Sequence, residues 1–184
     1  MALIGLLRWW QSIWDLWEQA KMDRLSDHFC EYEFACPHCG KAPMDPVLIN
    51  SLELLRTLLT KRYGQEVWIG INSGYRCKEY NEDLIRRGYN ASRTSQHLTG
   101  RAADCRFPPW VNLAVAHDEA LQIGPFEQGG IGVYAPYRVG EKVKGNFLHL
   151  DTRGSIARFG EVEGKRVRYK RALKEARKWT GKNS

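Results

Sequence analysis

Apolar residues recur at helical spacing in the first 24 residues of the chain. Leu3, Leu7, Trp10, Trp14 and Trp17 are separated alternately by four and three positions, which places these side chains on one face of a helix. We expect this amphipathic, tryptophan-rich N-terminal helix to pack on the rest of the protein or on a second copy of itself. Contact with a membrane surface is the alternative, because tryptophan favours the lipid headgroup region.

The pattern of residues 25–160 mixes helical and extended segments. The clearest helix is expected to begin after Asp45, a good N-cap, with Pro46 in its first turn, and to end at Gly64. Because helices and strands do not alternate regularly, we predict one α+β domain with a small antiparallel sheet and flanking helices. The other expected helices are 79–87 and 111–122, and the expected strands are 67–71, 101–107, 130–134 and 146–152.

Residues 161–184 form a basic C-terminal segment with helical character. We expect either a solvated helix end or an arm that binds anionic envelope polymers. The net charge of +7 on 184 residues also favours an anionic partner, although charge alone does not choose among nucleic acid, acidic phospholipid and the bacterial envelope. No motif predicts specific nucleic-acid binding. The positive charges of the segment are Lys165, Arg166, Arg168, Lys170, Arg171, Lys174, Arg177, Lys178 and Lys182.

The chain has five cysteines, and an odd number cannot pair completely within one chain. Cys36 and Cys39 form a C-x-x-C pair, which is typical of half a structural metal site or of a redox pair. His38 or Cys30 could add a further ligand. A second, structural metal at Cys36 and Cys39, a disulfide between them, and free packed thiols all remain open.

No convincing secretory signal precedes the domain, because the apolar run from Met1 to Leu7 has no basic region before it and is short. No segment approaches the roughly 20 apolar residues of a membrane span. We therefore expect the protein to be made in the cytoplasm. If its substrate is cell wall, it would act in the periplasm or cell wall after release, or as part of a virion.

The chemistry of the chain concentrates in two stretches, Ser95–Asp104 and Phe147–Gly154. His97 and Asp104 lie seven positions apart across Gly100, a spacing that suits two ends of a tight turn facing one metal. His149 lies in an apolar strand, where alternation places it on the same face as Asp151. A catalytic zinc site takes three such ligands and leaves a fourth position for water. The competing interpretation is an ordinary turn aspartate and a half-buried histidine.

Together with these residues, several motifs extend over residues 27–160. They are Ser73-Gly74-Tyr75-Arg76, then Asn81, then Ser95-x-His97-x-x-Gly100-x-Ala102-x-Asp104, then Gly130-x-Gly132-x-Tyr134, then His149-x-Asp151-x-Arg153-Gly154. In this set the sequence resembles the zinc D-Ala-D-Ala carboxypeptidase family, which shares its fold with the hedgehog signalling domain. Their order and spacing resemble the branch found among phage endolysins and bacterial wall peptidases. The resemblance implies a mixed sheet, one catalytic zinc, and cleavage of short peptides that contain D-amino acids.

The resemblance also implies roles for individual residues. His97, Asp104 and His149 become the zinc ligands. Arg76 would hold a substrate carboxylate or the oxyanion of the tetrahedral intermediate, with a structural salt bridge as the alternative. Ser95 would either bind substrate or support His97. The expected substrate-binding residues are thus Ser95, Arg76 and Tyr134.

The general base is open, because some relatives carry it two or three positions before the last ligand, and here those positions are Phe147 and Asn146. Neither side chain accepts a proton at neutral pH. Asp151 is the nearest carboxylate on the same strand face and is our candidate base. Alternatively, Asp151 orients a ligand from behind.

These expectations describe a zinc peptidase that hydrolyses peptidoglycan peptides, as a D,D-carboxypeptidase or an endopeptidase, in the manner of an endolysin. A dipeptidase acting on free D-Ala-D-Ala is a second possibility within the same chemistry. A non-catalytic, zinc-containing module that binds cell wall is the alternative from a different class.

Overall fold

A six-stranded sheet lies at the centre of the computed structural model, which describes residues 23–179. All neighbouring strands are antiparallel except β3 (Gly130–Tyr134) and β7 (Ala157–Val162), which run parallel, so the sheet is mixed. The predicted α+β class is confirmed. The sheet is not the wholly antiparallel one that the sequence pattern predicted, because this parallel pair makes it the mixed sheet that the resemblance implies. In spatial order the strands are β1 (Gly70–Ser73), β2 (Ala102–Arg106), β6 (Phe147–Asp151), β3 (Gly130–Tyr134), β7 (Ala157–Val162) and β8 (Lys165–Val167).

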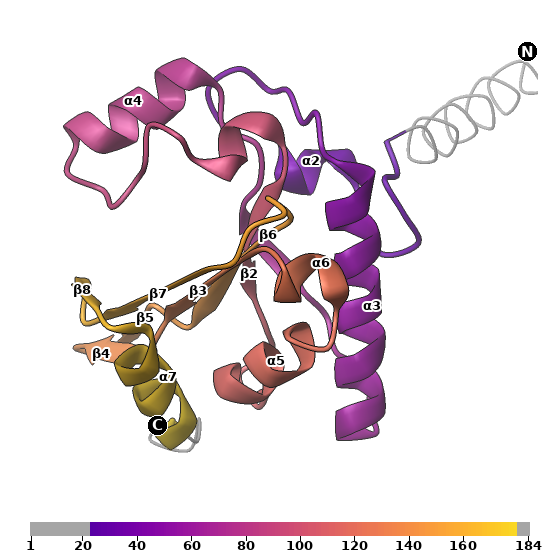
Figure 1. Cartoon of the computed structure of the whole chain (residues 1–184), viewed down its shortest axis with the longest axis vertical. Helices are drawn as coiled ribbons and strands as arrows, with labels where there is room; N and C mark the ends of the chain where they lie inside the picture. The colour runs from indigo at the N-terminus through magenta and orange to yellow at the C-terminus, as the bar shows by residue number, and fades with distance from the viewer. Residues whose placement is uncertain (1–22, 180–184) are drawn as a thin grey trace, which may run out of the picture.

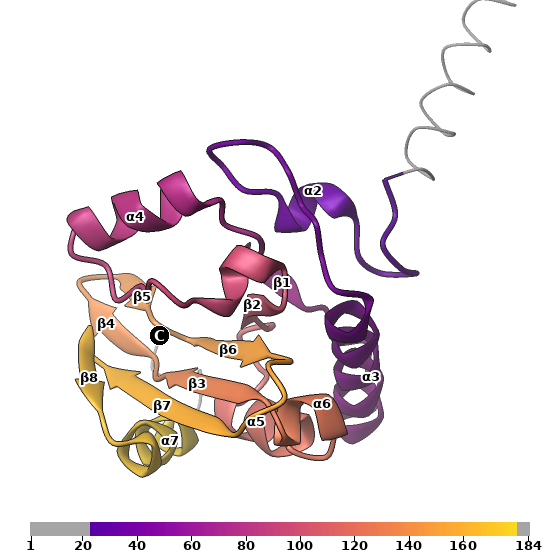
Figure 2. The ribbon, with the colours of Figure 1, turned by 45° about the horizontal axis from the view of Figure 1, so that its top comes forward.

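Helices cover the two faces of the sheet unequally (Figures 1 and 2). One face carries α5, α6 and α7, and the long helix α3 packs against α5 and α6. The opposite face carries α4 and the short 3-10 helix η1, and α2 contacts β1. The helices are α2 (Glu31–Phe34), α3 (Pro46–Tyr63), α4 (Lys78–Arg86), η1 (Gln96–Thr99), α5 (Leu113–Ala120), α6 (Gly124–Glu127) and α7 (Tyr169–Lys178).

Alternation along β6 separates the core from the chemistry. Leu148 and Leu150 are fully buried in the hydrophobic core, whereas His149 and Asp151 point to the opposite face of the sheet. On β2, Asp104 shares the face of His149. The polar residues of both motifs therefore lie together, on the face away from the α5 helix.

The helix expected after Asp45 is confirmed as α3: the Asp45 side chain accepts from the backbone N–H of Val47 at 2.9 Å, and the helix ends at Gly64. The expected strand 130–134 is β3, and 101–107 and 146–152 shorten slightly to β2 and β6. Sequence periodicity missed α6, β7, β8 and the small hairpin of β4 (Tyr137–Val139) and β5 (Lys142–Lys144).

The described part of the basic C-terminal segment, up to residue 179, packs against the sheet. Strand β7 spans position 161, where we expect that segment to begin, and α7 packs on β7 and β3. Ala172 and Ala176 of α7 are fully buried, while its basic side chains remain exposed.

The predicted N-terminal helix falls almost wholly on residues 1–22, outside the described residues, so its packing and membrane alternatives stay predictions. Among helices of the described part, none has the length and apolar character needed to cross a membrane.

Candidate metal centre

Three side chains that the motifs single out meet at one point: His97 from η1, Asp104 from β2 and His149 from β6. Nδ1 of His149 lies 3.0 Å from Oδ1 of Asp104 and 3.2 Å from Nε2 of His97. The third side of this triangle, from His97 Nε2 to Asp104 Oδ1, measures 3.4 Å. All three residues are buried. The structure thus brings together the whole ligand set expected from the sequence.

Local backbone geometry explains this convergence. In the sheet, Asp104 is the direct antiparallel partner of His149. His97 returns to them through the turn at Gly100, whose φ is +68° and where a Cβ atom would lie 1.8 Å from the carbonyl oxygen of Pro43. Only glycine fits such a position. The tight turn predicted between His97 and Asp104 is therefore confirmed.

The hydrogen bonds behind each imidazole determine which nitrogen faces the centre. Nδ1 of His97 donates to the carbonyl oxygen of Gly74 at 2.6 Å, so Nε2 presents its lone pair. Nε2 of His149 donates to Oδ2 of Asp151 at 2.9 Å, so Nδ1 presents its lone pair. Two imidazole lone pairs and a carboxylate oxygen therefore face one another, and a cation would stabilise this arrangement.

The electrostatics of the site also favour a positive charge there. Burial alone raises the pKa of Asp104, but His97 and His149 hold that pKa well below its ordinary value. Burial lowers the pKa of His97, which keeps this imidazole neutral. Burial lowers the pKa of His149 as well, but hydrogen bonds to Asp104 and Asp151 outweigh it and raise that pKa overall. The site therefore favours an added positive charge, which a metal ion would supply with His97 and His149 as neutral ligands and Asp104 as an ionised one.

The donor set fits zinc. Bonds of about 2.1 Å in a tetrahedral arrangement place neighbouring ligand atoms about 3.4 Å apart. The observed separations of 3.0, 3.2 and 3.4 Å approach that value. Three protein ligands beside a cleft are typical of catalytic zinc sites, whereas structural sites are closed by four.

Asp151 does not occupy the position that the general-base interpretation requires. Its side chain is fully buried and does not line the cleft. Oδ2 accepts from His149, and both carboxylate oxygens accept from Arg153, at 2.8 and 2.6 Å. Burial raises the pKa of Asp151, but His149 and Arg153 hold it well below its ordinary value. This placement matches the alternative weighed from the sequence, in which Asp151 orients His149 from behind.

Arg76 and Ser95 both contact the ligand residues. Arg76 donates to Oδ2 of Asp104 at 2.7 Å and to Oγ of Ser73 at 2.8 Å, so the salt-bridge alternative is present in the structure. Oγ of Ser95 accepts from the backbone N–H of His97 at 3.4 Å, which supports the η1 turn. Both residues also line the cleft, where a substrate would reach them.

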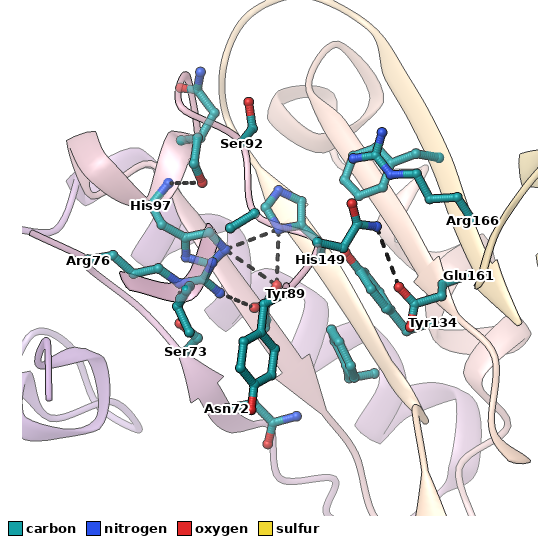
Figure 3. A pocket seen from close by; sticks show the side chains of 18 of the residues that line it. Asn72, Ser73, Arg76, Tyr89, Ser92, His97, Tyr134, His149, Glu161 and Arg166 are labelled. Carbon is teal, nitrogen blue, oxygen red and sulfur yellow. Dashed lines mark hydrogen bonds and ion pairs between the residues drawn. The ribbon is translucent and has the colours of Figure 1, made fainter. Parts of the chain in front are cut away.

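A cleft of about 760 Å³ opens over the ligand residues on the helix-poor face of the sheet (Figure 3). Tyr134, expected to bind substrate, lines it and stacks on Phe147 with ring centroids 4.1 Å apart. Burial raises the pKa of Tyr134, so its hydroxyl stays protonated and can donate a hydrogen bond.

Several cleft residues were missed from the sequence. Glu161 of β7 and Arg166 of β8 lie on one side of His149 (Figure 3), and Tyr89, from the loop between α4 and η1, also lines the cleft. The side chain of Asn90, from the same loop, donates to Glu161 at 3.5 Å. Apart from the ligand Asp104, Glu161 is the one carboxylate that lines the cleft in the described part of the chain.

A mixed sheet that presents two histidines and an aspartate at the floor of an open cleft defines a candidate catalytic metal centre. A protein-family model described as "Peptidoglycan L,D-endopeptidase MepK" matches residues 18–158, more than half of the chain. The chain belongs to this family of peptidoglycan peptidases, as the motif resemblance predicts. Searches of curated proteins and of solved structures gave no significant match.

Proposed function

We propose that this chain is a zinc-dependent endopeptidase that hydrolyses peptide bonds in peptidoglycan. The observation that carries the proposal is the convergence of Nε2 of His97, Oδ1 of Asp104 and Nδ1 of His149, all as lone-pair donors, at the floor of an open cleft. Nitrogen and oxygen ligands in this number suit zinc. Family membership supplies the substrate class.

The shape of the cleft favours an endopeptidase over a carboxypeptidase. Ser73 and Arg76 lie on one side of His149, and Glu161 and Arg166 lie on the other (Figure 3). A chain that continues past the cut bond in both directions would fit such a cleft, whereas a carboxypeptidase needs only one extended side. The family description names an L,D-endopeptidase, so we propose a bond between an L- and a D-residue as the one cut.

The residues around the proposed zinc position have different roles in the reaction. When bound, zinc lowers the pKa of a coordinated water and polarises the scissile carbonyl. Asp151 keeps His149 in the tautomer that presents Nδ1. Arg76 fixes Oδ2 of Asp104, and the hydroxyl of Tyr134 donates to the substrate. For the general base we propose Glu161, because a base must reach the substrate side of the cleft.

Digestion of purified peptidoglycan tests this function. Soluble fragments are separated and identified by mass spectrometry, with the His97→Ala variant as the control. The proposal expects internal cuts that release new amine ends, absent with His97→Ala. Release of a terminal D-alanine alone indicates a carboxypeptidase, turnover only of free D-Ala-D-Ala indicates a dipeptidase, and wall binding without any release indicates a non-catalytic module.

The proposed function also suggests where the protein acts and which other partners it contacts. We propose that the enzyme acts at the cell wall or in the periplasm after release from the cytoplasm, or as a virion component. The exposed basic face of α7 supports attraction to anionic envelope polymers. Contact of the N-terminal segment with a membrane or a second copy remains a prediction from its tryptophan pattern.

A further inference from the structure

A second group of metal-binding side chains lies outside the cleft, where the loop after α2 meets the start of α4. The sulfur atoms of Cys36, Cys39 and Cys77 lie within 4.8 Å of one another. Cys36 and Cys39 belong to the loop, and Cys77 is the N-cap residue of α4, about forty positions later. The single C-x-x-C pair in the sequence thus acquires a third thiol that the linear spacing does not reveal.

The distances within this group suit a shared ion. Sγ of Cys36 lies 3.7 Å from Sγ of Cys77. Two thiolates on one tetrahedral zinc, with bonds of about 2.3 Å, lie about 3.8 Å apart, whereas a disulfide needs about 2.05 Å. Nδ1 of His38 lies 3.3 Å from Sγ of Cys77, and His38 and Glu79 form a second group of possible ligands around this sulfur, so His38 is a candidate for a fourth ligand.

The backbone closes into a tight turn between Cys36 and Lys41. Gly40 has a φ of +71°, and its N–H donates to the carbonyl oxygen of Cys36 at 2.8 Å. The N–H of Cys36 donates to Lys41 at 2.9 Å and so closes the loop. From the other segment, the N–H of Cys77 donates to Sγ of Cys36 at 3.4 Å. A backbone N–H aimed at sulfur favours the thiolate, the form that binds metal.

We propose that Cys36, Cys39, Cys77 and His38 bind a second zinc ion with a structural role. Three sulfurs and one nitrogen are among the usual ligand sets of structural zinc. The two inner sulfurs are buried, and Cys39 is exposed, so an ion can reach the site from solvent. No part of this site belongs to the catalytic cleft.

The ion would connect two segments that position the cleft. Arg76 directly precedes Cys77, and its guanidinium holds Asp104 through the 2.7 Å hydrogen bond. The backbone N–H of Tyr75 donates to the carbonyl oxygen of Phe34 at 2.9 Å, so the two segments are in contact two residues before each cysteine. A zinc ion at the cysteines would fix this junction and with it the direction of Arg76.

Metal content and cobalt substitution test the proposal on the full chain. We expect about two zinc ions per purified chain, and a thiolate-to-cobalt charge-transfer band after exchange with Co²⁺. His97→Ala should keep the band and lose only one ion. Cys39→Ser, a change at an exposed position, should lose the band and one ion while the catalytic ion stays.

Cys30→Ser is the matched control, because Cys30 lies outside the group and serine keeps its place as the N-cap of α2. It should retain the band and both ions. The absence of the band in the wild-type protein would overturn the proposal, as would a Cys39→Ser variant with unchanged zinc. Mass spectrometry of the unreduced, alkylated protein that shows a disulfide among these cysteines would also overturn it. Each of these results would overturn the second zinc site without contradicting the proposed peptidase function, which is tested separately by digestion of cell wall.

Discussion

Oδ2 of Asp151 accepts a hydrogen bond from Nε2 of His149 at 2.9 Å, across the imidazole from the Nδ1 that faces Asp104. This contact assigns the two carboxylates different roles. Asp104 lies among the ligand atoms, while Asp151 lies behind a ligand and is neutralised by Arg153. Such a carboxylate fixes the ring and increases its basicity toward the metal. In the proposed mechanism, proton transfer from a zinc-bound water would therefore fall to another group.

The first prediction concerns the ligands themselves. His97→Ala and His149→Ala each remove one of three ligands, so both variants should lose the catalytic zinc and peptidoglycan hydrolysis together. Zinc per chain and fragment release are measured on the same preparations. A variant that retains both the catalytic ion and full activity would sink the ligand assignment.

The second prediction separates orientation from base catalysis at Asp151. Asp151→Asn removes the charge behind His149, and such changes typically weaken metal binding about 10- to 100-fold. Competition with a chelator measures the affinity. With saturating zinc, most of the activity should return, because in our proposal Asp151 orients His149 and is not the group that accepts the proton of water. A variant that binds zinc normally yet stays slow would instead restore Asp151 as the base.

The third prediction assigns the base to Glu161. Glu161→Gln should keep zinc and lower kcat by about 10²- to 10⁴-fold, the usual contribution of a positioned acid or base. Glu163→Gln is the matched control, because Glu163 lies two residues later on the exposed turn before β8. Unchanged kcat in Glu161→Gln, on wall fragments and on a soluble peptide, contradicts this assignment.

The candidate ligand set could be predicted because its motifs resemble those of a zinc peptidase family, and local rules explain part of how these residues converge. The Gly100 turn brings His97 back toward β2, and alternation along β6 places His149 and Asp151 on one face. Alternation does not determine the rotation of the imidazole. Asp151 lies behind His149 because Nε2 of this ring donates to Oδ2 of Asp151, which Arg153 also contacts, and the alternation of side chains does not reveal this rotation.

The residues missed from the sequence depend on contacts between distant segments. Strand β7 carries Glu161 in a run with charges and a glycine, so it lacks a clear apolar alternation, and its parallel partner β3 is distant in sequence. The third cysteine of the proposed structural site was missed for the same reason, because its position depends on a contact between distant segments. Cys77 reaches Cys36 only because α2 packs on β1 and the loop after it meets the start of α4.

The fourth prediction concerns the pH dependence of folding stability. Glu53 of α3 accepts hydrogen bonds from Oγ of Ser26 at 2.6 Å and from the backbone and ring nitrogens of His28 at 2.9 and 2.8 Å. Partial burial raises the pKa of Glu53, but these donors hold it below its ordinary value. A depressed pKa stabilises the fold above the unfolded value of about 4.3 and loses that effect as pH falls.

The melting midpoint of Glu53→Gln should therefore lie below that of the wild type near neutral pH. The difference should shrink as pH falls below about 4, where the wild-type carboxyl becomes protonated. Glu141→Gln, at an exposed turn between β4 and β5, should show little difference at any pH. A constant gap between wild type and Glu53→Gln across this range contradicts the proposed role of ionised Glu53.

The fifth prediction concerns the basic face of α7. Because Ala172 and Ala176 are buried against the sheet, a truncation before this helix would damage the fold and would say nothing about adhesion. Replacing Lys170, Arg171 and Lys174 by glutamine removes exposed charge and leaves the buried side of the helix intact. Binding to whole cell walls should weaken, most clearly at low salt, because exposed charges are screened over a Debye length of about 8 Å at physiological ionic strength.

Turnover of a small soluble peptide by the same variant should stay unchanged, since none of its three substitutions lines the cleft. The control variant carries glutamine at Lys41, Lys61 and Arg62, which are exposed positions outside α7. It loses the same number of positive charges, so it distinguishes an effect of the basic face of α7 from an effect of net charge. If both variants bind walls equally weakly, net charge is responsible and α7 is no adhesion surface. If the α7 variant binds as well as the wild type at every salt concentration, the attraction to anionic polymers lies elsewhere or is absent. A melting curve checks that each variant is folded before binding is compared.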